Sequence, residues 1–223
     1  MEKFLGENIF QNSNINKSAL WFEAEPISPR KGESGNTEGN TKLDLAFGGI
    51  NKRDGKVGGI EFDPNNDFSW VCFVEAKFLS DCSTNVSYDP FRNQLARIIE
   101  NLVTFQNTED NSKYPNPTYF TLLTPRVFKE RPFSKLYGYK FFEYHDRQRL
   151  QHEFDLCTLN KRNEDRWEYP EGIENRLSIL KLNWVTFEEI LEAELGLSHL
   201  NLIKIDDSTN SQLHKKINPY IIY

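Results

Sequence analysis

The most informative stretch of this chain is Phe68-Ser69-Trp70-Val71-Cys72-Phe73-Val74-Glu75-Ala76-Lys77. It follows a polar turn signal and is rich in aromatic and β-branched residues, so it predicts a buried β-strand. Residues two apart in a strand point to the same side, and Glu75 and Lys77 therefore leave the sheet together at its C-terminal end. Two charges at the end of an apolar strand are costly unless they pair with each other or hold a metal ion. For this strand alone, a salt bridge between them is the simpler interpretation.

A second predicted strand, residues 41–50, carries Asp44 in an otherwise apolar run. An aspartate on one strand and Glu-x-Lys on a later strand are typical of a carboxylate-metal site that hydrolyses phosphodiesters. Mg²⁺ prefers oxygen ligands, usually one or two carboxylates with water and substrate phosphate. Asp44 and Glu75 can supply the carboxylates, and the backbone carbonyl of Ala76 can be a third ligand. Lys77 can polarise the attacking water or neutralise charge on the phosphate.

Asp44 and the triplet Glu75-Ala76-Lys77 resemble the motif of the PD-(D/E)XK nuclease superfamily, which includes many restriction endonucleases and the lambda-exonuclease-like enzymes. Leu43 stands where the motif usually has proline. The triplet is the only Glu-x-Lys in the chain, and the only Asp-x-Lys, residues 54–56, lies in an evident turn. The resemblance is specific over about residues 20–105.

This resemblance implies an α/β fold with a restriction-endonuclease-like core, in which helices flank a mixed central sheet. It implies Mg²⁺ as the cofactor, with Mn²⁺ as a substitute. It also implies nucleic acid as the partner, with DNA as the first candidate.

Residues 19–25 predict the end of a helix, which Pro26 stops. In the resembled family a glutamate on the first core helix often completes the acidic cluster. Glu23 is the first candidate, because Glu25 precedes a proline and is less suited to a helix. A solvated helix end is an equally simple interpretation of Glu23.

Polar and glycine-rich segments connect these elements. Residues 26–40 predict a mobile loop, in which Arg30 contacts either a phosphate backbone or, as base rates for surface charges favour, only solvent. Residues 41–50, 57–62 and 68–77 predict an antiparallel meander, in which paired glycines mark bulges or bends. The glycine pairs do not have the spacing of a dinucleotide or phosphate loop.

A helix is predicted over residues 91–103, with Asp89 as its N-cap and its apolar face in the core. Gln94 and Arg97 lie on a polar stripe beside that face. Many exonuclease-like members of the resembled family carry a glutamine on the helix after the catalytic lysine, and Gln94 matches it. The tyrosine often found four residues later is Ile98 here. Arg97 is the first candidate for a contact to the scissile phosphate or the DNA backbone, although an exposed helical salt bridge is equally compatible.

Residues 117–124 predict a core strand parallel to the Glu75 strand. Arg126 follows at its C-terminal end, which is the end that faces ligands in open α/β sheets. We therefore expect Arg126 to contact substrate. Residues 177–185 predict a late strand, and residues 186–189 form a capping box that opens the last helix.

The composition bounds the class of protein. The 223 residues suffice for a single nuclease-like domain, residues 1–223, with a helical insertion at about 126–175. Three cysteines without metal-ligand spacing favour a reducing, cytoplasmic setting over a disulfide framework. No apolar run approaches the roughly 20 residues that span a bilayer, so no membrane association is expected. The net charge of −6 argues against non-specific binding of nucleic acid through a general positive field.

Three functions are compatible with these patterns. The first is a metal-dependent nuclease that hydrolyses phosphodiester bonds. The second, which ranks below the first, is a catalytically silent module of the same fold that binds nucleic acid or protein. The acidic net charge and the missing tyrosine favour it slightly, whereas the retained set of Asp44, Glu75 and Lys77 disfavours it. The third, hydrolysis of a small phosphate ester, ranks last because no nucleoside-binding pattern is visible. A homodimer or a protein partner is compatible with each.

For the nuclease, the predicted residues are Asp44, Glu75, Lys77 and Gln94 in catalysis, Asp44, Glu75, Ala76 and Glu23 around the metal, and Arg97 and Arg126 on the substrate.

Overall fold

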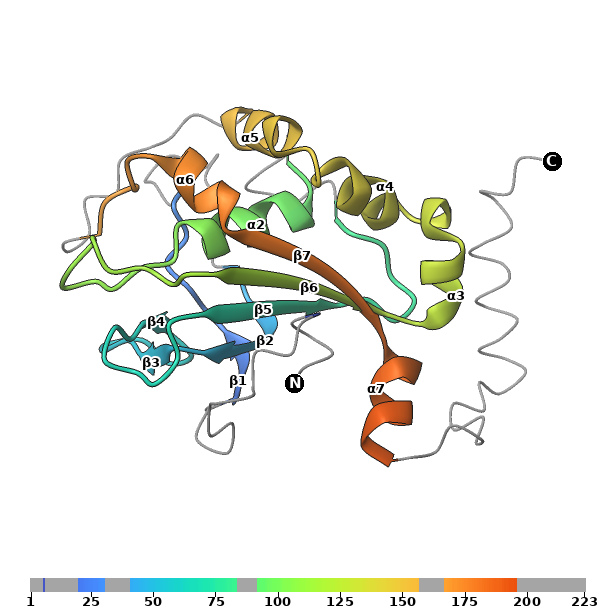
Figure 1. Ribbon diagram of the computed structural model, residues 1–223, viewed down its shortest axis with the longest axis horizontal. Helices are drawn as coiled ribbons and strands as arrows, with labels where there is room; N and C mark the ends of the chain where they lie inside the picture. Colours follow the sequence, from blue (N-terminus) through green and yellow to red (C-terminus); the bar gives the residue numbers. More distant parts are fainter. Residues whose placement is uncertain (1–5, 7–19, 31–40, 84–91, 157–166, 196–223) are drawn as a thin grey trace.

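A mixed five-stranded sheet forms the centre of the molecule. The computed structural model describes residues 6, 20–30, 41–83, 92–156 and 167–195. The strand order is β1-β2-β5-β6-β7; β1, β2 and β5 pair antiparallel, and β5, β6 and β7 pair parallel (Figure 1). The strands are β1 (Leu20–Ala24), β2 (Leu43–Gly48), β5 (Val71–Ala76), β6 (Thr118–Thr124) and β7 (Leu180–Thr186). The predicted α/β class with a mixed sheet is therefore confirmed, as are the strand at 117–124 and its parallel pairing with the Glu75 strand.

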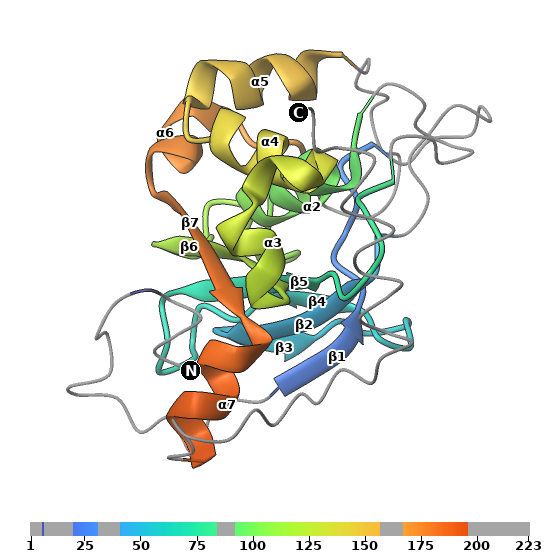
Figure 2. The same ribbon diagram turned by 90° about the vertical axis from the view of Figure 1, so that its right-hand side faces the viewer.

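Helices cover both faces of the sheet unequally. Figures 1 and 2 show α2, α4, α5 and α6 layered over one face, whereas α7 follows β7 to the opposite side. The segment expected to be a helical insertion, residues 126–175, contains α4 and α5 and the start of α6. The described helices are α2 (Gln94–Val103), α3 (Arg126–Glu130), the 3-10 turn η3 (Pro132–Ser134), α4 (Leu136–Glu143), α5 (Arg147–Asp155), α6 (Ile173–Ser178) and α7 (Phe187–Leu195).

Alternation along β5 builds two hydrophobic cores. Val71 and Phe73 pack into the larger core beneath α2, α4, α5 and α6. Cys72 and Val74 face the smaller core, against which α7 packs. Because side chains alternate in a strand, Glu75 continues the row of Val71 and Phe73 and lies on the face covered by helices.

The predicted meander is only partly correct: the antiparallel pairing across the turn at residues 54–55 forms, but the chain leaves the main sheet at Gly48–Gly49. β2 pairs directly with β5, and β3 (Ile50–Lys52) with β4 (Ile60–Phe62) forms a separate two-stranded sheet. Gly48 has φ +115°, and a Cβ there would lie 2.3 Å from the carbonyl oxygen of Trp70. A Cβ on Gly49 would lie 2.2 Å from the carbonyl oxygen of Phe68. Only glycine permits this close approach, so the expected bend occurs here and divides the predicted strand 41–50.

The predicted helix at residues 19–25 is wrong, since residues 20–24 form the edge strand β1. Its register with β2 runs from Leu20 opposite Phe47 to Ala24 opposite Leu43. Pairing with a neighbouring strand outweighs the weak local preference for helix that the sequence suggested.

The two helix starts differ in how well they were predicted. α2 begins at Gln94, where the side chain of Asn93 accepts a hydrogen bond from the backbone N–H of Ala96. The expected cap, Asp89, lies outside the described residues. The capping box of α7 is confirmed, because the Thr186 hydroxyl accepts from the Glu189 N–H and the Glu189 carboxylate accepts from the Thr186 N–H.

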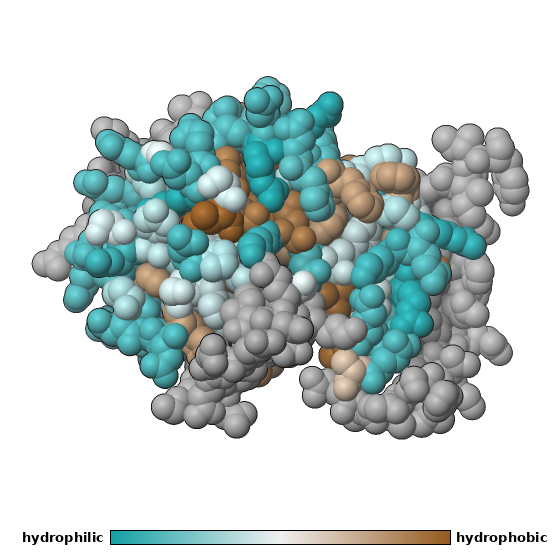
Figure 3. Space-filling view, viewed as in Figure 1, coloured by the Kyte–Doolittle hydropathy of each residue, from teal (hydrophilic) through white to brown (hydrophobic). Residues whose placement is uncertain are grey.

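The surface around β7 is less polar than its surroundings. Figure 3 shows a hydrophobic band across the middle of the molecule, where β7 forms the edge of the sheet, with hydrophilic surface over α5. Among the helices in the described part of the chain, none combines the length and the apolar character required to traverse a bilayer.

Candidate active site

Asp44 and Glu75 meet where β2 and β5 pair. The register places Leu45 opposite Val74, and one further step places Asp44 opposite Glu75 on the helix-covered face of the sheet. The backbone N–H of Ala76 donates a hydrogen bond of 2.7 Å to Oδ2 of Asp44. Two carboxylates that are far apart in the sequence therefore lie opposite each other on adjacent strands of the sheet.

Lys77 is anchored just beyond the end of β5. Its backbone N–H donates to the carbonyl oxygen of Leu123 at 2.8 Å, which fixes the residue against β6. Its Nζ lies 2.7 Å from Oε1 of Glu75 and donates to Oε1 of Gln94 at 2.8 Å. The predicted pairing of Glu75 and Lys77 on one side of the strand end is confirmed.

Gln94 joins helix α2 to this pair. Its Nε2 donates to Oε1 of Glu75 at 2.6 Å, and its Oε1 accepts from Lys77. As the first residue of α2, Gln94 ties the start of that helix to the end of β5. Glu75, Lys77 and Gln94 thus form a closed triangle of charge-assisted hydrogen bonds.

Arg97 follows one turn later on α2 and is buried, with 7% of its surface exposed. Its positive charge lowers the pKa of Glu75, so it lies within electrostatic reach of the site. The alternative of an exposed helical salt bridge is wrong, because the side chain is not exposed.

Glu75 has an unusually high pKa for a glutamate. It is only 2% exposed, and burial raises its pKa from 4.5 to about 7. Lys77 acts in the opposite direction, Asp44 raises the pKa further through like-charge repulsion, and Arg97 lowers it. The cations around Glu75 therefore do not fully offset the rise in its pKa that burial causes.

One oxygen of Glu75 is unused. Oε1 bonds Lys77 and Gln94, whereas Oε2 is buried and has no hydrogen-bond partner among the described residues. A buried carboxylate oxygen without a partner is costly unless a ligand completes it.

A divalent cation fits this oxygen and its neighbours. In the described ranges no group of three or more His, Cys, Asp or Glu side chains lies close enough to hold a metal. The available donors are thus two carboxylates, on Asp44 and Glu75, and the carbonyl of Ala76. This small set of hard oxygen donors suits Mg²⁺, which usually keeps water and substrate phosphate in its remaining positions.

Glu23 is not brought into this group. It lies on β1, next to the strand of Asp44, but its backbone has φ +50° and its side chain is exposed. The neighbouring Glu25 is buried and lies 2.6 Å from Nζ of Lys56. The structure therefore gives neither glutamate a place beside Glu75.

Arg126 is directed away from the site. Its guanidinium pairs with Glu192 of α7 at 2.5 Å, and its backbone N–H donates to Glu188. The hydrogen bond to Glu192 raises the pKa of Arg126, and the pair is largely exposed. The expected position at the end of β6 is correct, but the side chain is engaged with α7.

A second buried charged cluster escaped the sequence interpretation. Glu100 of α2 is fully buried and accepts from Nε and Nη2 of Arg30, from Arg92 and from the hydroxyl of Tyr169. The expectation that solvent surrounds Arg30 is wrong, since it is 4% exposed. Arg30 lies seventy positions from Glu100, and no local pattern predicts such a pair.

Comparison of the chain with protein-family models, with curated proteins and with solved structures found no match.

Proposed function

We propose that this chain is a metal-dependent nuclease of the PD-(D/E)XK kind, which hydrolyses phosphodiester bonds in DNA. The observation that carries the proposal is Oε2 of Glu75, a buried carboxylate oxygen without a partner among the described residues, beside Asp44 and with Lys77 on the other oxygen. A purely structural salt bridge has no use for the second carboxylate or for the unfilled oxygen.

The residues divide the work by chemistry. Asp44, Glu75 and the carbonyl of Ala76 would hold Mg²⁺ or Mn²⁺. When bound there, the ion supplies Lewis-acid polarisation of the phosphate and lowers the pKa of bound water. Lys77 provides a positive charge beside these oxygens, which stabilises negative charge that builds on the phosphate.

Gln94 and Arg97 serve the site from helix α2. Gln94 bonds both Glu75 and Lys77, so it holds the carboxylate and the ammonium in a fixed relation. Arg97 is a further cation within electrostatic reach of Glu75 and is suited to a phosphate oxygen. The contacts of Arg126 with α7 do not support its assignment as a substrate residue.

The silent module remains the second candidate, for a specific reason. Glu23 is exposed, so the acidic set contains two side chains where the resemblance implied a third. The net charge of −6 also offers no general attraction to nucleic acid. On this alternative the chain keeps the fold and the Glu75–Lys77 pair but binds its partner without cleavage.

A cleavage assay tests the proposal. Circular and linear DNA would be incubated with the protein in Mg²⁺, in Mn²⁺ or in EDTA. We expect metal-dependent cleavage that falls by about 100-fold or more in both variants, because Glu75→Gln weakens a metal ligand and Lys77→Ala removes a positive charge beside the reacting phosphate. Lys113→Ala, an exposed lysine far from the site in sequence and in fold, is the matched control and should cleave like wild type.

A binding measurement separates the two candidates. Mg²⁺ should raise the melting temperature of the wild type and of Lys77→Ala, but not that of Glu75→Gln, because only the last variant loses a metal ligand. Full cleavage by Lys77→Ala would refute the catalytic assignment. Absence of both cleavage and Mg²⁺ stabilisation in the wild type would favour the silent module.

A further inference from the structure

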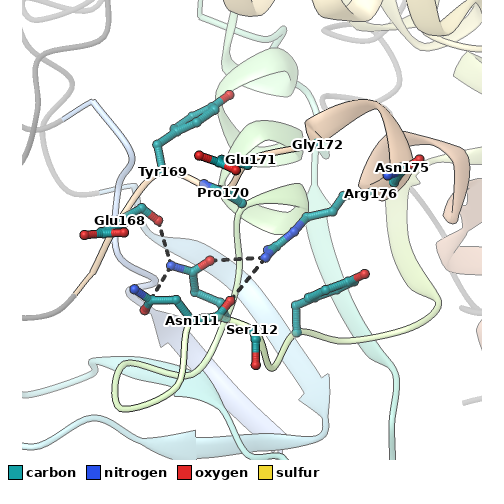
Figure 4. Close-up of a pocket in the computed structure, with 11 residues that line it drawn as sticks. Asn111, Ser112, Glu168, Tyr169, Pro170, Glu171, Gly172, Asn175 and Arg176 are labelled. Carbon is teal, nitrogen blue, oxygen red and sulfur yellow. Dashed lines mark hydrogen bonds between the residues drawn. The ribbon is translucent and has the colours of Figure 1, made fainter.

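A polar pocket lies at the end of helix α2 that is remote from Gln94. It has a volume of about 410 Å³ and is lined by two segments, residues 106–114 after α2 and residues 168–176 leading into α6 (Figure 4). The ten residues of α2 separate it from Gln94 by roughly 15 Å along the helix axis. A volume of this size is within the roughly 300 to 1,000 Å³ typical of pockets for small molecules.

The pocket contains a buried guanidinium with only neutral partners. Arg176 is 6% exposed and is directed from α6 toward residues 106 and 111. Its acceptors are the carbonyl oxygens of Val103, Phe105 and Asn111 and the side-chain oxygen of Gln106, at 3.3 to 3.5 Å. These distances are at the long end of the hydrogen-bond range, so the charge is only weakly satisfied.

No carboxylate among the described residues forms an ion pair with Arg176. Glu168 and Glu171 line the rim but are exposed, and Figure 4 shows the Glu168 carboxylate pointing away from the guanidinium. Burial lowers the pKa of Arg176 to about 10, as expected for a charge that lacks a counter-ion. Arg30, by contrast, is buried in contact with Glu100.

An aromatic surface lies against the same guanidinium. The ring of Tyr114 is 4.0 Å from the guanidinium carbon and is 38% exposed. Asn111 and Asn175 add amide groups to the lining. The pocket thus offers one positive charge, a partly open ring and amide donors.

We propose that this pocket binds a small organic anion, whose carboxylate or phosphate group pairs with Arg176. The anion supplies the missing counter-charge, and its remaining part occupies the space between Tyr114 and the amide side chains. A lone phosphate ion would leave most of a pocket of about 410 Å³ unfilled. This inference is independent of the proposed nuclease activity.

Thermal unfolding with three probes tests the proposal. The full chain, wild type and Lys77→Ala, would be heated in EDTA with inorganic phosphate, a nucleoside monophosphate or succinate. At ten times Kd, the melting temperature should rise by about 3 to 6 °C with an organic anion. A response to the monophosphate alone assigns the recognised group as phosphate, and a response to succinate alone assigns it as carboxylate. An equal response of Lys77→Ala shows that binding does not occur at the proposed cleavage site.

Two matched Asn→Asp substitutions, one inside the pocket and one outside it, provide the decisive variants. Asn111→Asp is isosteric and places a carboxylate in the pocket, so it should raise the melting temperature without ligand and abolish the response to anions. Asn65→Asp adds the same charge on an exposed loop outside the pocket and should respond like wild type. No saturable response of the wild type to any probe, or an undiminished response in Asn111→Asp, would overturn the proposal.

Discussion

Helix α2 contacts two buried glutamates that are satisfied in opposite ways. Glu100, within the helix, has both oxygens in ion pairs with Arg30 and Arg92. Glu75, on β5, is bonded to the first residue of the helix, but its Oε2 has no partner among the described residues. The two side chains are almost equally buried. Burial alone therefore does not distinguish a structural carboxylate from one that is available to a ligand.

The contrast between the two glutamates locates an incompletely compensated carboxylate at Glu75. Around Glu100, two guanidinium groups surround one carboxylate, an arrangement that stabilises the packing of residue 30 against α2. Around Glu75, a second carboxylate lies opposite in the sheet and raises its pKa. Groups with strongly shifted pKa values are concentrated at functional sites, and the Glu75 region matches that pattern.

The largest effect should come from breaking the satisfied cluster. Glu100→Gln removes the carboxylate that pairs with the buried guanidinium groups of Arg30 and Arg92, so we expect a loss of about 3 to 5 kcal/mol in the free energy of unfolding. Urea denaturation measures it, with the exposed Glu109→Gln as the control. A loss below about 1 kcal/mol would contradict this account, because removal of one partner from a buried ion pair should destabilise the fold strongly.

At Glu75, in contrast, replacement by glutamine should increase the free energy of unfolding relative to the wild type as the pH rises. Because its pKa in the fold is about 7, above the ordinary 4.5, the unfolded chain releases this proton first as the pH rises. The wild type should therefore lose up to about 3 kcal/mol between pH 4.5 and 7 relative to Glu75→Gln, which cannot ionise. Urea denaturation in EDTA across this range gives the difference between the two proteins. A difference that stays constant with pH contradicts the account.

The smallest effect should come from Arg126, which belongs to neither cluster. Its pair with Glu192 is largely exposed, so Arg126→Ala should cost about 0.5 kcal/mol or less. In the cleavage assay it should stay within about twofold of wild type, whereas loss of the buried Arg97 should reduce cleavage about tenfold, as for one charge-assisted contact. If Arg126→Ala reduced cleavage more than Arg97→Ala, Arg126 would belong to the substrate site after all.

The Glu75–Lys77 pair of the candidate site could be predicted because it depends on strand periodicity. The alternation that places Glu75 and Lys77 on one side is local, and it holds in the structure. Asp44 on a second strand and Gln94 on the following helix were also identified from sequence, and the structure brings both to Glu75. What the sequence could not provide is the free oxygen of Glu75, which depends on the packing of every neighbour.

The errors in the fold arose where tertiary contacts outweigh local preference. Residues 20–24 suggest a helix by themselves but pair with β2 as a strand. The predicted meander leaves the main sheet because Gly48 and Gly49 approach the backbone of a strand that comes later in the chain. Likewise, the burial of Arg30 depends on its pairing with Glu100, seventy residues away. None of these contacts leaves a signal within a short window of sequence.

The long helical segment between β6 and β7 has a consequence for how the chain can vary. β6 ends at Thr124 and β7 begins at Leu180, so 55 residues (125–179) lie between two adjacent strands. Yet the chain entropy of closing a loop grows slowly, by about 0.6 kcal/mol for each doubling of its length. Residues could be gained or lost in the exposed turns of this segment at little entropic cost, provided that its buried side chains stay in the larger core and Trp184 keeps its contacts with Tyr137 and Phe141. The pocket of Arg176 lies partly in this segment, whereas Asp44, Glu75 and Gln94 precede it. The proposed anion pocket at one end of α2 can therefore change in sequence while the residues of the candidate nuclease site at the other end are kept.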